Sequence, residues 1–200
     1  MIRQKTNIAI ITILAVSPLL LGGCLNFGGG KQTPSTIAED QTNRVYETPE
    51  FAVKFPRVWD LIEKKDFTAD VPQETVVVFR NNVKNEDFTA NINVVRNVLQ
   101  NQKETLEYAK EVIQRQMTGL YEYKELKRDS TKITINGQQV DTYFLIFEAK
   151  KDLADQPARF IQTFGVKGNN GYIIMGAVST KEDAGVQKTV EDIVKSFTVK

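Results

Sequence analysis

The sequence predicts an α+β domain, an α/β/α sandwich with a central antiparallel sheet. Two hairpin signals predict the antiparallel sheet: Asn136-Gly137 after an alternating segment, and the glycine-flanked turn 168–171 between two apolar segments. Segments 140–149 and 172–175 are apolar on both sides, so both faces of the sheet need cover. Two stretches with apolar residues at helical spacing can supply that cover.

Each expected strand has its own local signal. Segment 51–55 alternates and stops at Pro56, while 75–79 is a short apolar run. Segment 90–94 alternates between an apolar face and an Asn-rich face. The remaining strands flank the two hairpin turns, at 132–135, 140–149, 160–166 and 172–178.

The two helices are expected in the middle of the chain and near its end. The first covers 104–118, with a capping box from Asn101 and Glu104 and a stop at Gly119. The second has a capping box from Ser179 and Glu182, with Asp183 adding favourable charge. The apolar stripes are Leu106, Ala109, Ile113, Met117 and Leu120 in the first helix, and Val186, Val190, Ile193, Val194 and Phe197 in the second.

Composition excludes several classes of function. The 200 residues include 26 Lys+Arg, 25 Asp+Glu, one Cys and no His. A near-zero net charge argues against nucleic-acid binding. The absence of histidine removes histidine bases and His-ligated metals, and a single cysteine cannot form an internal disulfide or a Cys-X-X-Cys centre. We therefore expect no cofactor, no metal site and no catalytic residues.

The first residues read as an export signal. Arg3 and Lys5 precede an apolar run over 8–21, whose 14 residues are fewer than the roughly 20 of a membrane-spanning helix. The following Leu21-Gly22-Gly23-Cys24 resembles the lipobox of bacterial lipoproteins. This resemblance implies cleavage between Gly23 and Cys24 and lipidation of the Cys24 thiol, and hence a protein held by lipid on the outer face of the cell membrane or on the outer membrane. An ordinary signal peptide with an incidental cysteine is the alternative.

The sequence divides into residues 1–23 as signal peptide, 24–45 as a lipidated flexible linker and 46–200 as one domain. Gly28-Gly29-Gly30 lies in the linker and lacks the flanking strand and helix of a phosphate loop. Cleavage would remove Arg3 and Lys5, leaving 24 basic against 25 acidic side chains. Attraction to acidic headgroups is therefore not the expected anchor.

The domain resembles PsbP-type and Mog-type domains. The resemblance begins with Phe51, Val53 and Phe55-Pro56 followed by Trp59, and ends with Ile193-Val194 before Ser196-Phe197. It covers about residues 46–200 and implies a non-enzymatic α/β/α domain that docks on another protein, such as a membrane or photosystem-type complex. The histidine-containing metal sites of some photosynthetic members have no counterpart, because the chain has no His.

The candidate partner-binding residues are in the segment 121–129, which interleaves aromatic and charged side chains: Tyr121, Tyr123, Lys124, Lys127 and Arg128. Alternation would place Tyr121, Tyr123 and Glu125 on one strand face. An ordinary exposed edge strand protected by lysines is the alternative interpretation. The loop 150–152 is the other place where we expect docking.

Other features have a structural interpretation beside the functional one. Trp59 could anchor a partner, but packing in the domain's own core is favoured. Asn91, Asn93 and Asn97 share one strand parity and could bind sugar or peptide, with a solvated face or a hydrogen-bonded ladder favoured instead. The adjacent carboxylates Glu86-Asp87, Glu182-Asp183 and Glu191-Asp192 fit capping and solvation better than acid–base catalysis.

Two main hypotheses about function follow. The first is a lipid-anchored, non-enzymatic adaptor that binds an unidentified protein. The second is an envelope hydrolase with scattered carboxylates. A small-ligand or lipid carrier is a third hypothesis, and it predicts an empty apolar cavity between helix 104–118 and the sheet.

Overall fold

The computed structural model describes residues 36–39, 42–69, 71–83 and 88–200. Two α-helices pack on one sheet: α1 (Thr105–Gly119) and α2 (Ala184–Lys195). A short 3-10 turn, η1, covers Lys64–Asp66. The strands are β1 (Thr36–Glu39), β2 (Asn43–Glu47), β3 (Phe51–Pro56), β4 (Trp59–Glu63), β5 (Thr75–Asn81), β6 (Asn91–Val98), β7 (Tyr121–Ile135), β8 (Gln138–Lys150), β9 (Ala158–Lys167), β10 (Asn170–Ser179) and β11 (Thr198–Val199).

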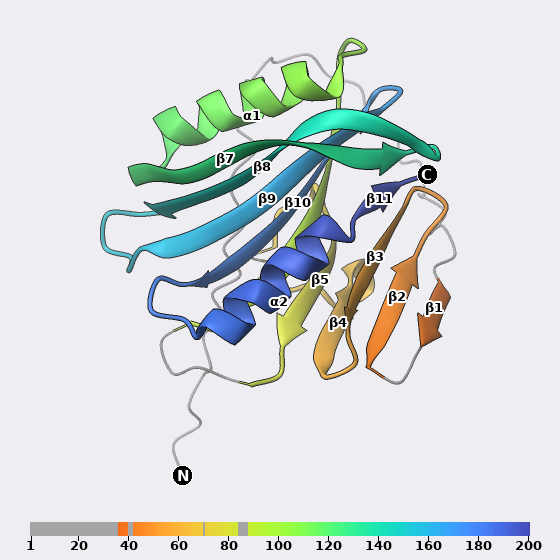
Figure 1. Cartoon of the computed structure of the whole chain (residues 1–200). Coiled ribbons are helices and arrows are strands. Elements are labelled where there is room, and N and C mark those ends of the chain that lie inside the picture. The colour runs from red at the N-terminus through yellow and green to blue at the C-terminus, as the bar shows by residue number, and fades with distance from the viewer. Residues whose placement is uncertain (1–35, 40–41, 70, 84–87) are drawn as a thin grey trace.

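The described strands form one curled sheet in the order β1-β2-β3-β11-β7-β8-β9-β10-β6-β5-β4 (Figure 1). Every neighbouring pair is antiparallel except β11 with β7, which are parallel. The predicted α+β architecture is confirmed, and this one parallel pair makes the sheet mixed.

Both predicted hairpins form. Asn136 (φ 53°) and Gly137 (φ 79°) make the loop between β7 and β8, and positive φ at both positions is the signature of the turn that matches strand twist. The second loop is shorter than the sequence indicated. Only Gly168 and Asn169 separate β9 from β10, whose pairing starts at Lys167 and Asn170.

Two apolar cores lie on opposite faces of the sheet, and β8 contributes to both. Phe144 joins the core under α2, whereas Leu145 and Phe147 join the core under α1. Figure 1 shows α2 inside the curve of the sheet and α1 along its other face. The strands that are apolar on both sides are therefore covered on both sides, as predicted.

The curl brings the first strands back against the last strands of the sheet order. The Arg44 Nη2 atom on β2 donates to the Trp59 carbonyl of β4 at 2.7 Å, and the Phe55 and Phe79 rings lie 4.6 Å apart. Trp59 is only 4% exposed, so its prediction as a core residue is confirmed. The inner core is consequently enclosed by the sheet as well as by α2.

The helices correct two details of the sequence prediction. In α1 the buried stripe ends with Gln116 instead of Met117, which is 46% exposed. Neither predicted capping box forms. Glu104 occupies the N-cap of α1 without a side-chain bond, because the helix starts directly after it at Thr105.

The cap of α2 comes from Asp183, whose carboxylate accepts from the Gly185 amide at 2.7 Å. The Ser179 hydroxyl instead accepts from the Lys181 amide within the preceding turn. The helix starts at Ala184, too far along the chain for a box that begins at Ser179.

The sheet includes residues expected in the linker. Strands β1 and β2 pair with each other, and β2 pairs with β3, so strand structure starts at Thr36, ten residues before the expected domain start at Tyr46. The predicted cleavage site at Gly23 and the predicted lipidation at Cys24 lie outside the described residues.

Candidate functional site

The five candidate partner-binding residues all lie in the first half of β7. Two register shifts against β8, at Tyr121/Lys124 and at Glu125/Lys127, interrupt the alternation that the sequence suggested. Each shift is a bulge that changes which side chains share a face. The five residues are therefore divided between the two faces of the sheet.

Tyr123 and Arg128 lie on the α1 face. The Tyr123 ring stacks on Phe147 at 4.9 Å, and the Arg128 guanidinium lies 5.7 Å from the centre of the Tyr143 ring. In the backbone register of β7 and β8, Lys124 lies opposite Glu148 and Lys127 lies opposite Ile146. Because Ile146 packs against the core under α2, Lys127 lies on the α2 face.

Tyr123 is the least accessible of the five. Its hydroxyl is buried and has no hydrogen-bond partner among the described residues. Burial raises the pKa of Tyr123 to about 12, and the negative charge of Glu125 adds to that effect. The ring extends the stack of Phe147 on Phe160, so Tyr123 contributes to the core under α1.

The basic side chains of the segment mostly have acidic neighbours. Lys127 bonds Asp129 at 2.7 Å, which raises the pKa of Lys127, and Arg128 bonds Glu125, which raises the pKa of Arg128. Lys124 is different, because its side chain has neither an ion pair nor a hydrogen bond to another described residue. The ion pairs of Lys127 and Arg128 are exposed, and exposed ion pairs contribute little to stability.

The predicted loop and the predicted strand come together. Tyr121 is the register partner of Lys150, and the Lys150 Nζ atom bonds the Glu122 carboxylate at 2.6 Å. The start of β7 and the loop after β8 therefore form one continuous surface. Leu153 in this loop and Tyr121 are both exposed.

Over most of its length, the outer edge of β7 has no strand partner among the described residues. In the sheet order its second neighbour is β11, which pairs only with Thr134 and Ile135. Along a strand of an antiparallel pair, the backbone N–H and C=O groups of successive residues point alternately to the partner strand and away from it. The two-residue loop makes Ile135 and Gln138 a hydrogen-bonded pair, which decides which residues of β7 point to β8. Arg128, Ser130 and Lys132 therefore direct their backbone N–H and C=O groups to the open side.

A separation of β8 from β9 shapes the surface beside this edge. The two strands pair only from Phe144 with Thr163 to Ala149 with Ala158. At the Phe144–Thr163 end, side-chain hydroxyl groups take the place of backbone hydrogen bonds between the strands. Thr142 donates to the Phe164 carbonyl at 2.9 Å, and Thr163 donates to the Tyr143 carbonyl at 2.9 Å.

A groove of about 480 Å³ lies on the α2 side of this separation, between β7 and the end of α2. Its apolar lining includes the Phe144 and Phe197 rings, and the Lys195 Nζ atom lies 4.7 Å from the centre of the Phe144 ring. The rest of the lining is mainly polar and comes from Asp129, Ser130, Thr131, Lys132, Thr134, Gln139, Thr163 and Thr198.

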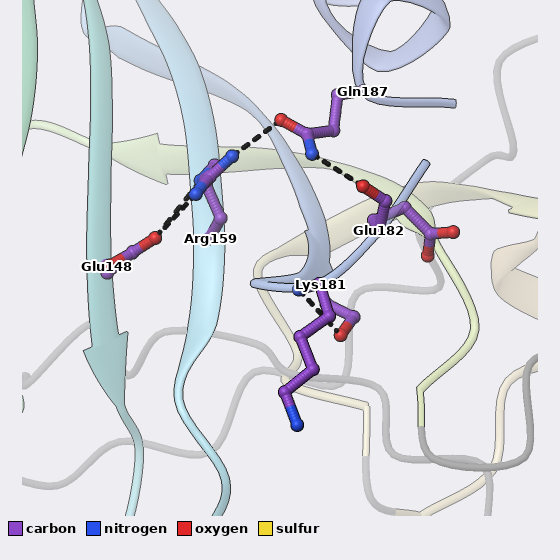
Figure 2. A network of polar contacts seen from close by, with 6 residues as sticks. Glu148, Arg159, Lys181, Glu182 and Gln187 are labelled. Atoms are coloured by element: carbon purple, nitrogen blue, oxygen red, sulfur yellow. Dashed lines mark hydrogen bonds and ion pairs between the residues drawn. The ribbon is translucent and has the colours of Figure 1, made fainter. Parts of the chain in front are cut away.

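A polar network connects the far end of β8 and β9 to α2. Arg159 donates to Glu148 at 2.7 Å and to the Gln187 side chain at 2.6 Å, and Gln187 donates to the Glu182 carbonyl at 2.8 Å (Figure 2). Its hydrogen bonds join β8, β9, α2 and the turn before α2, so we interpret this network as structural.

The asparagine strip on β6 is a buried ladder, which confirms one of the favoured interpretations. Asn91 and Asn93 are buried and are joined by a 3.1 Å hydrogen bond, while Asn97 donates to the Tyr108 hydroxyl at 2.8 Å. The solvated-face interpretation is wrong for Asn91 and Asn93, which are 4% and 0% exposed.

The two described carboxylate pairs belong to α2. Asp183 caps the helix, and Glu191 and Asp192 bond Lys195 and Lys188 one turn away. Glu86 and Asp87 lie outside the described residues. Among the described residues, no three Asp, Glu, Cys or His side chains are grouped to hold a metal, and no helix is long and apolar enough to cross a membrane.

Neither a family model nor a curated protein matches the chain. Its structure is similar to that of cyanobacterial PsbP from Synechocystis sp. PCC 6803, with 13% identity, coverage of 90% of this chain and 99% of that one, and a TM-score of 0.52. A variant of the Mog1 protein has 17% identity, coverage of 84% and 96%, and a TM-score of 0.48. A protein of unknown function from Pseudomonas aeruginosa has 13% identity, coverage of 73% and 83%, and a TM-score of 0.43.

The class of the domain follows from this comparison. A curled mixed sheet with one helix on each face is a PsbP-like fold, as the sequence predicted. The similarity to cyanobacterial PsbP, which extends over nearly the whole of both chains, carries that assignment. At 13% identity it concerns the fold alone, and function has to be argued from the site.

Proposed function

We propose that this protein is an exported lipoprotein, anchored through Cys24, whose PsbP-like domain is a non-enzymatic adaptor that binds a protein through β7. The observation that carries the binding part is that no other described strand pairs with the outer edge of this strand before Thr134. The anchoring part rests on the basic, apolar and Leu-Gly-Gly-Cys pattern of the first 24 residues.

An open sheet edge is a natural docking surface because its backbone groups need partners. Protein partners commonly add to such edges through main-chain hydrogen bonds. The edge is exposed, lies beside the β8–β9 loop, and carries Lys124 with no charged partner among the described residues. These properties favour a docking role for the candidate surface over a purely protective one.

The packing under α1 favours an adaptor over a small-ligand carrier. Tyr108, Ala109, Val112 and Ile113 are buried against the sheet. A Cβ atom on Gly171 would lie 2.5 Å from the Tyr108 ring, so the side chains meet closely there. The space where a carrier would hold an apolar ligand is filled at this contact.

The chain length between Cys24 and β1 restricts where a partner can be. Eleven residues separate Cys24 from Thr36, and even when fully extended they would span only about 40 Å. A domain tethered in this way stays at the membrane surface, so we expect its partner to be a membrane complex or another envelope protein.

The anchor is tested by mass and fractionation. Intact-mass analysis of the native protein should show a chain beginning at Cys24 with added diacylglycerol, and the Cys24→Ser variant should leave the membrane fraction. An unlipidated mature form, or a Cys24→Ser variant that stays membrane-bound, contradicts the anchoring proposal.

The partner is tested by site-specific photo-crosslinking in native membranes. A photoreactive residue at Lys124 should capture one discrete protein, while the same group at Lys65, an exposed lysine on η1, serves as the matched control. Capture of the same mixture of neighbours from both positions argues against a docking role for β7.

A further inference from the structure

We propose that Asn136 is a site of spontaneous covalent modification. Its side-chain amide is lost through a cyclic imide formed with Gly137, and the isoaspartate that results loosens the attachment of β11 to β7. The inference goes beyond the proposed function and does not depend on it, because it concerns the chemistry of the β7–β8 loop and needs no partner.

The reaction needs only the protein and water. The Gly137 backbone nitrogen loses its proton to solvent base and attacks the side-chain carbonyl carbon of Asn136, so that a C–N bond forms and the side-chain nitrogen leaves as ammonia. Water then opens the cyclic imide at either carbonyl. Opening at the side-chain carbonyl gives aspartate, whereas opening at the main-chain carbonyl gives isoaspartate, in which the main chain continues through the Cβ atom.

Two Asn-Gly pairs occur in the sequence, at 136–137 and at 170–171. A glycine after asparagine favours ring closure, because it has no side chain to obstruct the approach of its own nitrogen to the asparagine carbonyl. The two pairs have the same local chemistry, so any difference between their reactivities comes from the fold.

The pair at 136–137 is accessible in the folded protein. Both residues are exposed, and a Cβ atom on Gly137 would meet no heavy atom beyond its chain neighbours within 4 Å. Among the described residues, neither the Asn136 side-chain amide nor the Gly137 N–H has a hydrogen-bond partner. The attacking nitrogen and the carbonyl that it attacks are therefore both unprotected, and the ring has open space in which to form.

The pair at 170–171 is held by the sheet. Asn170 and Gly171 begin β10, which lies between β9 and β6, and Gly171 is the register partner of Asn97. Backbone N–H groups of a central strand bond one neighbouring strand or the other, so the Gly171 nitrogen is engaged. Gly171 is also buried, with the Tyr108 ring 2.5 Å from the position of a Cβ atom. Ring closure at Asn170 therefore requires β10 to open first.

Isoaspartate at position 136 changes a loop on which β11 depends. The Asn136 N–H donates to the Val199 carbonyl at 2.8 Å, and β11 pairs with β7 only at Thr134 and Ile135, directly before the loop. An extra main-chain atom does not fit a two-residue loop that needs positive φ at both positions, so the N–H moves away from Val199. Aspartate keeps the chain length and tolerates the left-handed conformation, so this product should leave β11 in place.

The first test incubates the purified full chain in mildly alkaline buffer and follows both pairs by mass spectrometry. Trypsin separates them, because they fall in the tryptic peptides 133–150 and 168–181. In the folded protein Asn136 should convert at least about tenfold faster than Asn170, whose reaction waits for local opening. In protein unfolded with guanidinium chloride the two should convert at similar rates, because the fold no longer distinguishes them.

The second test measures the consequence by amide hydrogen exchange at Thr198 and Val199. The isoaspartate form, separated from the incubated protein by chromatography, should exchange at least about tenfold faster there than the unmodified protein. Asn136→Asp supplies the aspartate product with an unchanged main chain. Asn136→Gly keeps the N–H and the positive φ but has no side-chain amide to lose. Fresh Asn136→Asp and incubated Asn136→Gly should both exchange like the unmodified protein.

Faster conversion of Asn136 than of Asn170, with faster exchange at β11 in the isoaspartate form alone, supports the inference. Conversion of Asn136 in the folded protein that is no faster than that of Asn170 overturns it. So does an isoaspartate form whose β11 amides exchange like those of the unmodified protein. Equal loosening in Asn136→Asp or in incubated Asn136→Gly also overturns it, because a longer main chain is then not the cause. These outcomes leave the adaptor function to the crosslinking experiment.

Discussion

A pair of buried glutamines between α1 and β9 gives the most discriminating prediction about the fold. Gln116 is 3% exposed and Gln162 is fully buried. Their amides exchange two hydrogen bonds, from Gln116 Nε2 to Gln162 Oε1 at 3.1 Å and from Gln162 Nε2 to Gln116 Oε1 at 2.6 Å. Each amide is therefore satisfied mainly by the other.

Replacing one partner should cost more than replacing both. Gln162→Met removes two hydrogen bonds, each contributing about 1 kcal/mol, and leaves the Gln116 amide buried without them, which adds about 1–3 kcal/mol. Each single variant should therefore lose about 3–5 kcal/mol, a large share of the roughly 5–15 kcal/mol by which a typical domain is stable. The double variant leaves no buried amide without a partner, so its free energy of unfolding should lie within about 1 kcal/mol of the wild-type value.

Urea denaturation followed by circular dichroism measures the four free energies of unfolding in this cycle. Gln114→Met, on the exposed side of α1, controls for the substitution itself and should change stability by less than about 0.5 kcal/mol. The reasoning is refuted if the double variant loses the sum of the two single losses, or if either single variant matches the Gln114→Met control.

Two further predictions concern packing and pH. Gly176→Ala should destabilise the domain by about 1–3 kcal/mol, because its Cβ would lie 2.1 Å from Val190 Cγ1. In thermal unfolding, the double variant with Val190→Ala should regain part of the lost stability. If it regains none, the clash with Val190 is not the cause of the loss. Burial raises the pKa of Tyr108 to about 12, partly opposed by its hydrogen bond from Asn97, so the folded state keeps a proton that the unfolded chain loses near pH 10. Stability should thus fall between about pH 10 and pH 12, by about 3 kcal/mol from this group, and an equally steep fall in Tyr108→Phe would assign the effect elsewhere.

Local sequence patterns predicted most of the sheet because their causes are local. The positive φ that a two-residue hairpin needs is supplied by Asn136 and Gly137 themselves. Alternation in β3 and helical spacing in α2 likewise reflect which side chains each element buries. Strand β4 was missed, since Trp59–Glu63 is held in the sheet mainly by pairing with β5 instead of by a pattern of its own.

The features that escaped prediction depend on distant partners. In the sequence, Gln116 has the polar character of an exposed helix residue. It can be buried because Gln162, 46 positions away, faces it and supplies its hydrogen bonds. The Thr105 hydroxyl accepts from the Val166 amide, a contact that no capping rule contains. The sequence placed the candidate partner-binding residues on one strand, but the two bulges of β7 arise from its pairing with β8 and redistribute its side chains.

Strand β11 makes continuity of the sheet depend on two residues that follow α2. Only Thr198 and Val199 lie between β3 and β7, and the side chain of Lys200 bonds Glu47, 153 residues earlier. During synthesis β1–β3 emerge well before β11, so their pairing with it waits until Thr198 and Val199 have been made. Without Thr198 and Val199 the strand pairing that joins β3 to β7 would be lost, and β1–β3 would keep only contacts such as Arg44 with Trp59 and Phe55 with Phe79, so two residues decide whether the sheet is continuous.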